Sequence, residues 1–190
     1  IASGARPAVP AIPGLETVPY LTGATALDLE ELPRSLLVIG GGYIGGELAQ
    51  MFARAGVKVT LVCRSRLLPE AEPEIGAALA GYFEDEGITV VSGIAYRAVR
   101  EADDGVSLTV TRDGQDIAID ADQVLITTGR TPNIEGLGLA EQGITVSAKG
   151  GIVVNDRMRT TRAGIYAVGD VTGRDQFVYI AAYGAKLAAK

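Results

Sequence analysis

The sequence has 190 residues, of which 47% are hydrophobic and 21% are charged, and this composition is typical of a globular protein with one or two domains. A formal net charge of −6 without any run of basic residues excludes the electrostatic surface of a nucleic-acid-binding protein. The chain has no histidine, one cysteine and no apolar run near the roughly 18 residues of a membrane span, so we expect a cytoplasmic protein without an intrachain disulfide, a membrane contact or a metal site.

The first half of the chain predicts a strand, a helix and a second strand in close succession. Residues 1–16 are rich in proline and glycine and are expected to be extended. The apolar run Ser35–Ile39 predicts a buried strand, and Val57–Cys63 predicts another. Residues 42–55 have helical spacing, and their apolar face consists of Ile44, Leu48, Met51, Phe52 and Ala55. Together the three elements form a β–α–β unit of the usual length.

A second helix and a third parallel strand follow this unit. The helix is predicted to begin near Pro73 and to end at Gly87, and the strand is Ile88–Val91. The predicted buried face of the helix consists of Ile75, Ala78, Leu79, Tyr82 and Phe83. These elements extend the parallel sheet.

Short alternating segments then predict an antiparallel meander. Its strands are Tyr96–Glu101, Val106–Arg112 and Gln115–Asp120, with a typical hairpin turn at Asp113-Gly114. The apolar run Gln123–Thr127 predicts one further strand, and the alanine-rich residues 181–190 predict a helix. We therefore expect an α/β fold in which residues 17–127 form a parallel sheet with a meander. Residues 1–16 and 128–190 would belong to a second, incomplete domain.

A glycine-rich sequence joins the first strand to the first helix. Residues 40–45 form a G-x-G-x-x-G motif in its confirming context of strand, turn and helix. Gly40 allows the tight turn, Gly42 lets the backbone approach a pyrophosphate, and Gly45 allows the helix to pack closely on the strand. The helix N-terminus offers N–H groups and a partial positive charge to the phosphates. We predict a Rossmann-like dinucleotide site that includes these glycines and Ile44; the alternative is a glycine-rich turn without a ligand.

The end of the second strand indicates which coenzyme is bound. An NAD site usually has an acidic residue there, which binds the ribose 2′-hydroxyl. This sequence instead has Cys63 followed by Arg64-Ser65-Arg66, and guanidinium groups with a hydroxyl suit the 2′-phosphate of NADPH. We predict NADPH binding by Arg64 and Arg66, and a buried, unreactive Cys63. In the alternative interpretation, both arginines lie on a solvated loop.

Four stretches, taken in order, give the whole chain a resemblance to the pyridine nucleotide–disulfide oxidoreductases, flavoproteins with two dinucleotide-binding domains. Residues 1–7 resemble the strand that leaves the flavin domain, although threonine is commoner in the family where this chain has Ser3. Residues 40–47 are similar to the NAD(P) fingerprint, and residues 127–133 to the strand that returns to the flavin domain. Residues 161–170 resemble the closing flavin motif.

This resemblance implies roles for the domains and for two residues. Residues 17–127 would form the NAD(P)-binding domain, whereas residues 1–16 and 128–190 would be parts of an FAD-binding domain. Gly129 would contact NADPH, and the carboxylate of Asp170 would bind the ribityl hydroxyls of FAD. The alternative for Asp170 is an ordinary Asx turn.

Two residues on the first predicted helix would face the nicotinamide end of the coenzyme. Tyr43 and Glu47 are one turn apart. The resemblance implies that Tyr43 covers the flavin and moves aside for the nicotinamide, and that Glu47 binds the carboxamide. The alternatives are a packing role for Tyr43 and a solvated first-turn position for Glu47, which the helix dipole would favour.

Within the family, the sequence is most similar to the mercuric reductase branch, through residues 47–54, 63–65 and above all 176–182. The resemblance implies that NADPH reduces FAD, and that FAD reduces a cysteine pair that converts Hg(II) to Hg(0). The cysteine pairs, the first FAD motif and the dimerisation domain would lie outside this chain. We therefore expect part of a longer, homodimeric enzyme, with no catalytic residue of its own and no activity alone.

Two other interpretations stay open. One keeps the family and changes the acceptor, as in a glutathione reductase-like or dihydrolipoamide dehydrogenase-like enzyme. The latter normally has an acidic residue where this chain has Cys63, which disfavours it. The other is a non-catalytic nucleotide-binding module, which the intact flavin motifs disfavour.

Overall fold

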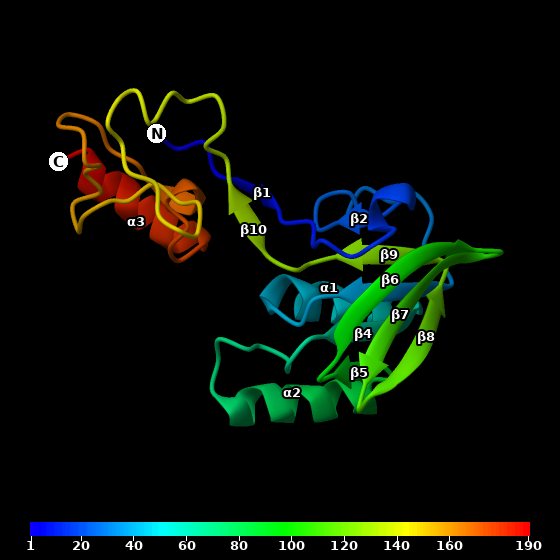
Figure 1. Cartoon of the computed structure of the whole chain (residues 1–190). Helices are drawn as coiled ribbons and strands as arrows, with labels where there is room; N and C mark the ends of the chain where they lie inside the picture. The colour runs from blue at the N-terminus through cyan, green and yellow to red at the C-terminus, as the bar shows by residue number, and fades with distance from the viewer. The chain divides into compact units, whose positions relative to one another are not determined.

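A five-stranded parallel sheet forms the centre of residues Pro7–Gly129 in the computed structural model, which describes all residues from 1 to 190 (Figure 1). The strand order is β2-β9-β3-β4-β5, and every neighbouring pair is parallel. The strands are β2 (Leu21–Thr22), β3 (Ser35–Ile39), β4 (Lys58–Cys63), β5 (Thr89–Ser92) and β9 (Gln123–Ile126). The short strand β2 was not predicted, because two residues are too few to show any alternation.

Two helices cover one face of this sheet. They are α1 (Tyr43–Arg54) and α2 (Pro73–Asp85). Leu48 and Phe52 of α1 and Phe83 of α2 share a buried cluster with Leu36 and Val38 of β3. The β–α–β unit, and with it the predicted α/β, Rossmann-like fold, is confirmed.

The buried faces of both helices are narrower than predicted. On α1, Ile44 and Met51 are 38% and 41% exposed, because the helix approaches the sheet along the side that bears its glycines and Ala49. On α2, Ile75 and Tyr82 are 52% and 64% exposed. This helix packs against β5, an edge strand, so only a narrow stripe of its surface finds a neighbour.

An antiparallel meander covers the opposite face of the sheet, as predicted. Its strands are β6 (Ala95–Ala102), β7 (Gly105–Arg112) and β8 (Gln115–Ala121). Leu108 and Val110 of β7 are fully buried with Leu37 and Ile39, the residues of β3 that alternate with those facing the helices. The central unit therefore has three layers: helices, parallel sheet and meander.

The proline-rich segment belongs partly to this central unit, which corrects the predicted boundary at residue 16. The two compact units of the chain are residues 7–129, and residues 1–6 with 130–190. Ile12 and Leu15 are buried in the cluster beneath the meander, and the carbonyl oxygen of Pro13 accepts a hydrogen bond from Val99 at 2.8 Å. Alternation could not reveal this, because residues 8–16 contain no strand, and their one regular element is the start of the 3₁₀ turn Leu15–Thr17.

The chain enters and leaves the central unit at neighbouring positions. The backbone N–H of Ala8 donates to the carbonyl oxygen of Gly129 at 2.9 Å, and the Thr128 hydroxyl donates to the carbonyl oxygen of Ala8 at 2.8 Å. Strands β1 (Ala5–Pro7) and β10 (Arg130–Pro132) continue this pairing as a two-stranded sheet. The segment by which the chain enters the central unit and the segment by which it leaves are therefore hydrogen-bonded to each other.

The second unit has a small core of its own. Besides the pair β1 and β10, it contains a 3₁₀ turn at Gly169–Thr172 and helix α3 (Val178–Ala188). The core consists of Leu139, Ile144, Ile152, Ala167 and Val171. Helix α3 begins three residues before Ala181, where we expected the helical segment to start. None of the structure's helices combines the length and the hydropathy that crossing a bilayer requires.

Candidate functional site

Three loops meet at the carboxyl edge of the parallel sheet. Ile39 of β3 is paired with Val62 of β4 and with Ile126 of β9. The residues that follow, Gly40, Cys63 and Thr127, therefore lie at the same edge. In open α/β sheets, ligands bind in the crevice outside the carboxyl ends of the strands. The predicted glycine motif, the arginine pair and Gly129 all follow strands that end here.

Two glycines of the motif are required by packing alone. Gly40 has φ +125°, and a Cβ there would lie 2.5 Å from the carbonyl oxygen of Thr127. A Cβ on Gly45 would overlap the carbonyl oxygen of Gly40 and lie 2.7 Å from the Thr127 hydroxyl. These two glycines let the turn and α1 approach the sheet, in agreement with the tight-turn and packing roles of the motif.

Gly42 is different, because open space surrounds the position of its missing side chain. No atom lies within 4 Å of a Cβ built on Gly42, and its φ of −80° is accessible to any residue. Gly42 is the N-cap of α1, no side chain caps this helix, and its first turn has no acidic residue. The positive end of the helix dipole is therefore not offset locally, and the backbone beside it is open to an anion.

Thr127 supports the glycine turn, a role that the sequence analysis missed. Its side chain is 9% exposed, and its hydroxyl lies 3.1 Å from the carbonyl oxygens of both Ile39 and Gly40. The backbone N–H of Thr127 also donates to Ile39 at 2.9 Å. The only signal in the sequence was a hydroxyl residue at the end of an apolar strand, which is too common to indicate a role.

The two predicted phosphate-binding arginines differ in their surroundings. Arg64 is exposed and makes no hydrogen bond or ion pair in the structure. Arg66 is half-buried, and its guanidinium group donates to three backbone carbonyls of its own loop: Leu68 at 3.2 Å, Pro69 at 3.0 Å and Ala71 at 2.8 Å. Only Arg64 thus presents a guanidinium group with all its donors available.

Cys63 packs beneath the glycine turn. It is 4% exposed, and a Cβ on Gly41 would lie 2.9 Å from the Cβ and 3.1 Å from the Sγ of Cys63. Burial raises the pKa of the Cys63 thiol, and a thiol that resists ionisation is a poor nucleophile. The geometry agrees with a small packing residue rather than a reactive one.

The residues predicted to face the nicotinamide lie on the outer side of α1. Tyr43 is 47% exposed at the first position of the helix, and Ile44 is 38% exposed. Glu47 is exposed one turn later, and it lies beyond the first turn, which contains no acidic residue. Glu47 is therefore solvated, as the alternative interpretation predicts, but the first-turn position in that alternative is wrong. Gly129 is exposed with φ +126°, where the chain leaves the sheet edge.

In the second unit, Asp170 is paired with Arg130. The Nε of Arg130 lies 3.2 Å from Oδ2 of Asp170, and both side chains are partly buried, at 32% and 25% exposed. The guanidinium group also donates to the carbonyl oxygen of Ala5. The carboxylate predicted to bind FAD is thus held by β10, although sequence reasoning gave Arg130 no role.

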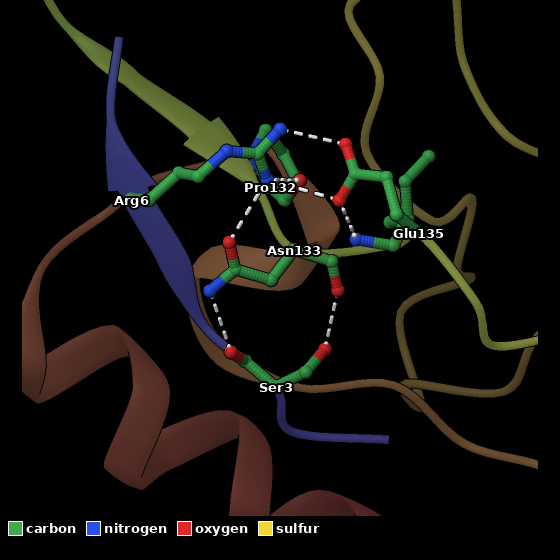
Figure 2. Close-up of polar contacts among 6 residues, drawn as sticks. Ser3, Arg6, Pro132, Asn133 and Glu135 are labelled. Atoms are coloured by element: carbon green, nitrogen blue, oxygen red, sulfur yellow. Dashed lines mark hydrogen bonds and ion pairs between the residues drawn. The ribbon is translucent and has the colours of Figure 1, made fainter.

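A polar network joins the first residues of the chain to the segment after β10 (Figure 2). The guanidinium group of Arg6 donates to both carboxylate oxygens of Glu135 at 2.6 and 2.9 Å and to the Asn133 side chain at 3.0 Å. The Ser3 hydroxyl donates to the Asn133 carbonyl oxygen at 2.7 Å, and the Asn133 amide donates to Ser3 at 3.0 Å. Hydrogen bonds from Arg6 lower the pKa of Glu135 to about 2.

A cavity of about 490 Å³ lies at the opposite edge of the sheet, where the strands begin. It is lined by Arg34, Lys58, Thr60, Asp120 and Asp122 among others. Arg34 and Asp122 form an ion pair there at 3.0 Å. No glycine turn or helix N-terminus opens into this cavity, so the carboxyl edge is the candidate site.

The family model for pyridine nucleotide-disulphide oxidoreductases matches residues 1–185 of this chain. The chain belongs to this family. Its match includes the glycine turn, the arginine loop and the segment around Asp170. The chain spans about a third of the length of the curated relatives it matches.

These curated relatives include mercuric reductases. The protein from Staphylococcus aureus is 46% identical over 184 residues, which cover 96% of this chain and 34% of the relative. The protein from Streptomyces lividans is 46% identical over 182 residues, covering 96% and 38%. The predicted similarity to this branch of the family is confirmed.

Solved structures of longer proteins have the same fold. The HOCl-induced flavoprotein disulfide reductase RclA from Escherichia coli has a TM-score of 0.85 and 35% identity, covering 97% of this chain and 42% of that one. LpdA from Mycobacterium tuberculosis has a TM-score of 0.86 and 31% identity, covering 98% and 40%. The α/β architecture of this family member is thus shared with longer relatives.

Proposed function

We propose that this chain is the NADPH-binding region of an FAD-dependent oxidoreductase of the mercuric reductase type. The observation that carries the proposal is the open space at Gly42, beside the uncapped N-terminus of α1. A pyrophosphate fits there, because backbone N–H groups and the helix dipole both favour an anion. Exposed Arg64, at the end of the neighbouring strand β4, is suited to the 2′-phosphate.

The residues of this chain would bind and orient the coenzyme. The glycine turn would hold the pyrophosphate and Arg64 the extra phosphate, so that the nicotinamide end extends along α1 toward Glu47. Glu47 would accept a hydrogen bond from the carboxamide, and Tyr43 would cover the nicotinamide site until the coenzyme enters. Holding the reacting groups in a fixed orientation is the main contribution of such a site to the rate.

The second unit would supply part of an FAD site. The carboxylate of Asp170, positioned by Arg130, would bind the ribityl hydroxyls. FAD, when bound, would accept a hydride from NADPH and pass electrons onward. The chain itself has one cysteine and therefore no dithiol of its own.

The proposed acceptor of the complete protein is Hg(II), with mercury detoxification as its role and a homodimer as its assembly. This finer assignment is supported by identities of 42–46% to seven mercuric reductases, compared with 35–36% to the solved disulfide reductase RclA. A second candidate is reduction of a disulfide, which is favoured by the backbone similarity to RclA.

Titration of the chain with NADPH and NADH by calorimetry tests the binding proposal. We expect saturable binding that is tighter for NADPH, and absence of any heat with either coenzyme would refute it. Oxidation of NADPH by the complete protein, with Hg(II) compared with a disulfide as acceptor, then distinguishes the two candidates. Turnover with the disulfide alone would overturn the mercuric assignment and leave coenzyme binding intact.

A further inference from the structure

The loop between β4 and α2 is held to the glycine turn by its backbone. The N–H of Leu68 donates to the carbonyl oxygen of Gly41 at 2.7 Å, and the N–H of Gly93 donates to the carbonyl oxygen of Ser65 at 3.0 Å. Leu68 has φ +46°, a left-handed conformation that a leucine rarely adopts and that requires support from its surroundings. The loop is therefore fixed in an unfavourable local conformation beside the phosphate site.

Arg66 supplies that support from within the loop. Its guanidinium group donates to the carbonyls of Leu68, Pro69 and Ala71, so that one planar group holds three nearby carbonyls of the backbone together. No carboxylate pairs with Arg66. Space around it is limited, because Nη1 would lie 3.4 Å from a Cβ on Gly76. The Arg66 side chain therefore packs against its own loop and does not extend into solvent.

Arg64 lies two residues earlier and has none of these contacts. Arg64 and Ser65 are continuous with the loop that Arg66 holds, and the carbonyl oxygen of Ser65 is itself fixed by the N–H of Gly93. We propose that Arg66 is a positioning residue for coenzyme selection: it holds the loop so that Arg64 alone contacts the 2′-phosphate. This inference rests on the proposed function, and it departs from the sequence-based expectation that both arginines bind the phosphate.

A double-mutant cycle separates positioning from direct contact. The measured quantity is the NADH-to-NADPH ratio of dissociation constants for the full chain and for Arg64→Ala, Arg66→Ala and the double variant. We expect each single variant to lower the ratio about tenfold or more, because each loses the charge-assisted hydrogen bond between Arg64 and the 2′-phosphate. Arg64→Ala removes the bond directly, and Arg66→Ala removes it by releasing the loop. We expect the double variant to match Arg64→Ala, since Arg66 acts only through Arg64. Additive losses would show that Arg66 contacts the phosphate itself and would overturn the proposal.

Arg66→Lys gives a second, independent distinction. Lysine keeps the positive charge but lacks the planar fork that reaches three carbonyls. A positioning role predicts that Arg66→Lys has the same low ratio as Arg66→Ala. Retention of most of the NADPH preference in Arg66→Lys would mean that charge, not loop geometry, is what Arg66 provides, and the proposal would fail.

Limited trypsin digestion reports on the loop without any coenzyme. We expect cleavage after Arg64 to be faster in Arg66→Ala than in the unaltered chain, with the control Arg100→Ala unchanged. Arg100 is an exposed arginine of β6 with no side-chain partner, so its replacement changes the net charge equally. Unchanged cleavage in Arg66→Ala would overturn the loop-holding role. Equal binding of both coenzymes by the unaltered chain would instead overturn selection and leave dinucleotide binding standing.

Discussion

The hydroxyl of Thr127 lies 3.1 Å from the carbonyl oxygen of Gly40, and a Cβ on Gly45 would collide with both groups. Strand β9, the glycine turn and the first turn of α1 are thus packed in direct contact. Gly42 stands outside this contact and faces open space. The motif therefore contains two kinds of glycine: Gly40 and Gly45 are required by packing, whereas Gly42 is not.

Substitution of these two kinds of glycine should have opposite effects. We expect Gly42→Val to leave the chain folded but to abolish dinucleotide binding, since the new side chain fills the space that the pyrophosphate would occupy. Gly45→Ala should instead lower the free energy of unfolding by about 1–3 kcal/mol, as overpacking typically does. Urea denaturation and coenzyme titration of both variants check this. Full affinity in Gly42→Val would exclude the pyrophosphate contact.

Thr127→Val tests the support beneath the turn. The substitution keeps the shape of the side chain and removes the hydroxyl that contacts Ile39 and Gly40, so we expect a loss of about 0.5–1.5 kcal/mol in the free energy of unfolding. Urea denaturation provides the measurement, and Thr109→Val on β7 is the matched control, because its hydroxyl has no partner in the structure. Equal effects of the two variants would contradict the role of Thr127.

The ion pair between Arg6 and Glu135 should be visible in a carboxyl titration. Hydrogen bonds from Arg6 lower the pKa of Glu135 from 4.5 to about 2. A lowered pKa means that the contribution to stability is present above pH 4.5 and is lost as the pH falls toward 2. NMR titration should show the pKa of Glu135 returning toward its ordinary value in Arg6→Ala. An ordinary pKa in the unaltered protein would contradict the ion pair.

Tyr96 predicts a change in stability at alkaline pH. Burial against the core raises the pKa of Tyr96 from 10 to about 12. Since the folded state favours the neutral phenol, stability is full below pH 10 and decreases as the pH rises toward 12. In Tyr96→Phe, the urea midpoint should fall less steeply over this range. Identical slopes in Tyr96→Phe and the unaltered chain would show that Tyr96 is not the group responsible.

Much of the central unit could be read from the sequence, because apolar runs and their periodicity indicate where strands and helices lie. The apolar run Ser35–Ile39 is strand β3 without any shift in its limits, and the turn at Asp113-Gly114 joins β7 to β8 as expected. The extent of burial on α2 could not be predicted. Whether Ile75 and Tyr82 are covered depends on the helix lying over an edge strand, which is a property of the tertiary fold.

The glycine positions of the candidate site could be predicted, because they depend on backbone conformation. The contacts of its arginine and threonine side chains could not, because they depend on the tertiary fold. Gly40 and Gly45 occupy positions at which only glycine fits, and a motif records that requirement. Arg64 and Arg66 looked equivalent, because sequence does not show whether a guanidinium group meets solvent or nearby carbonyls. Thr127 was missed for the same reason, since its partners belong to a turn 87 residues earlier in the chain.

The hydrogen bond between Ala8 and Gly129 brings the two ends of the central unit to one point. A unit whose two ends lie close together has the geometry of an inserted domain, because it can be joined to a host protein at one position in a loop. Residues 7–129 therefore have the geometry of a unit that can be inserted into a host domain, or removed from it, at one position. The same geometry makes residues 7–129 a natural unit for separate expression.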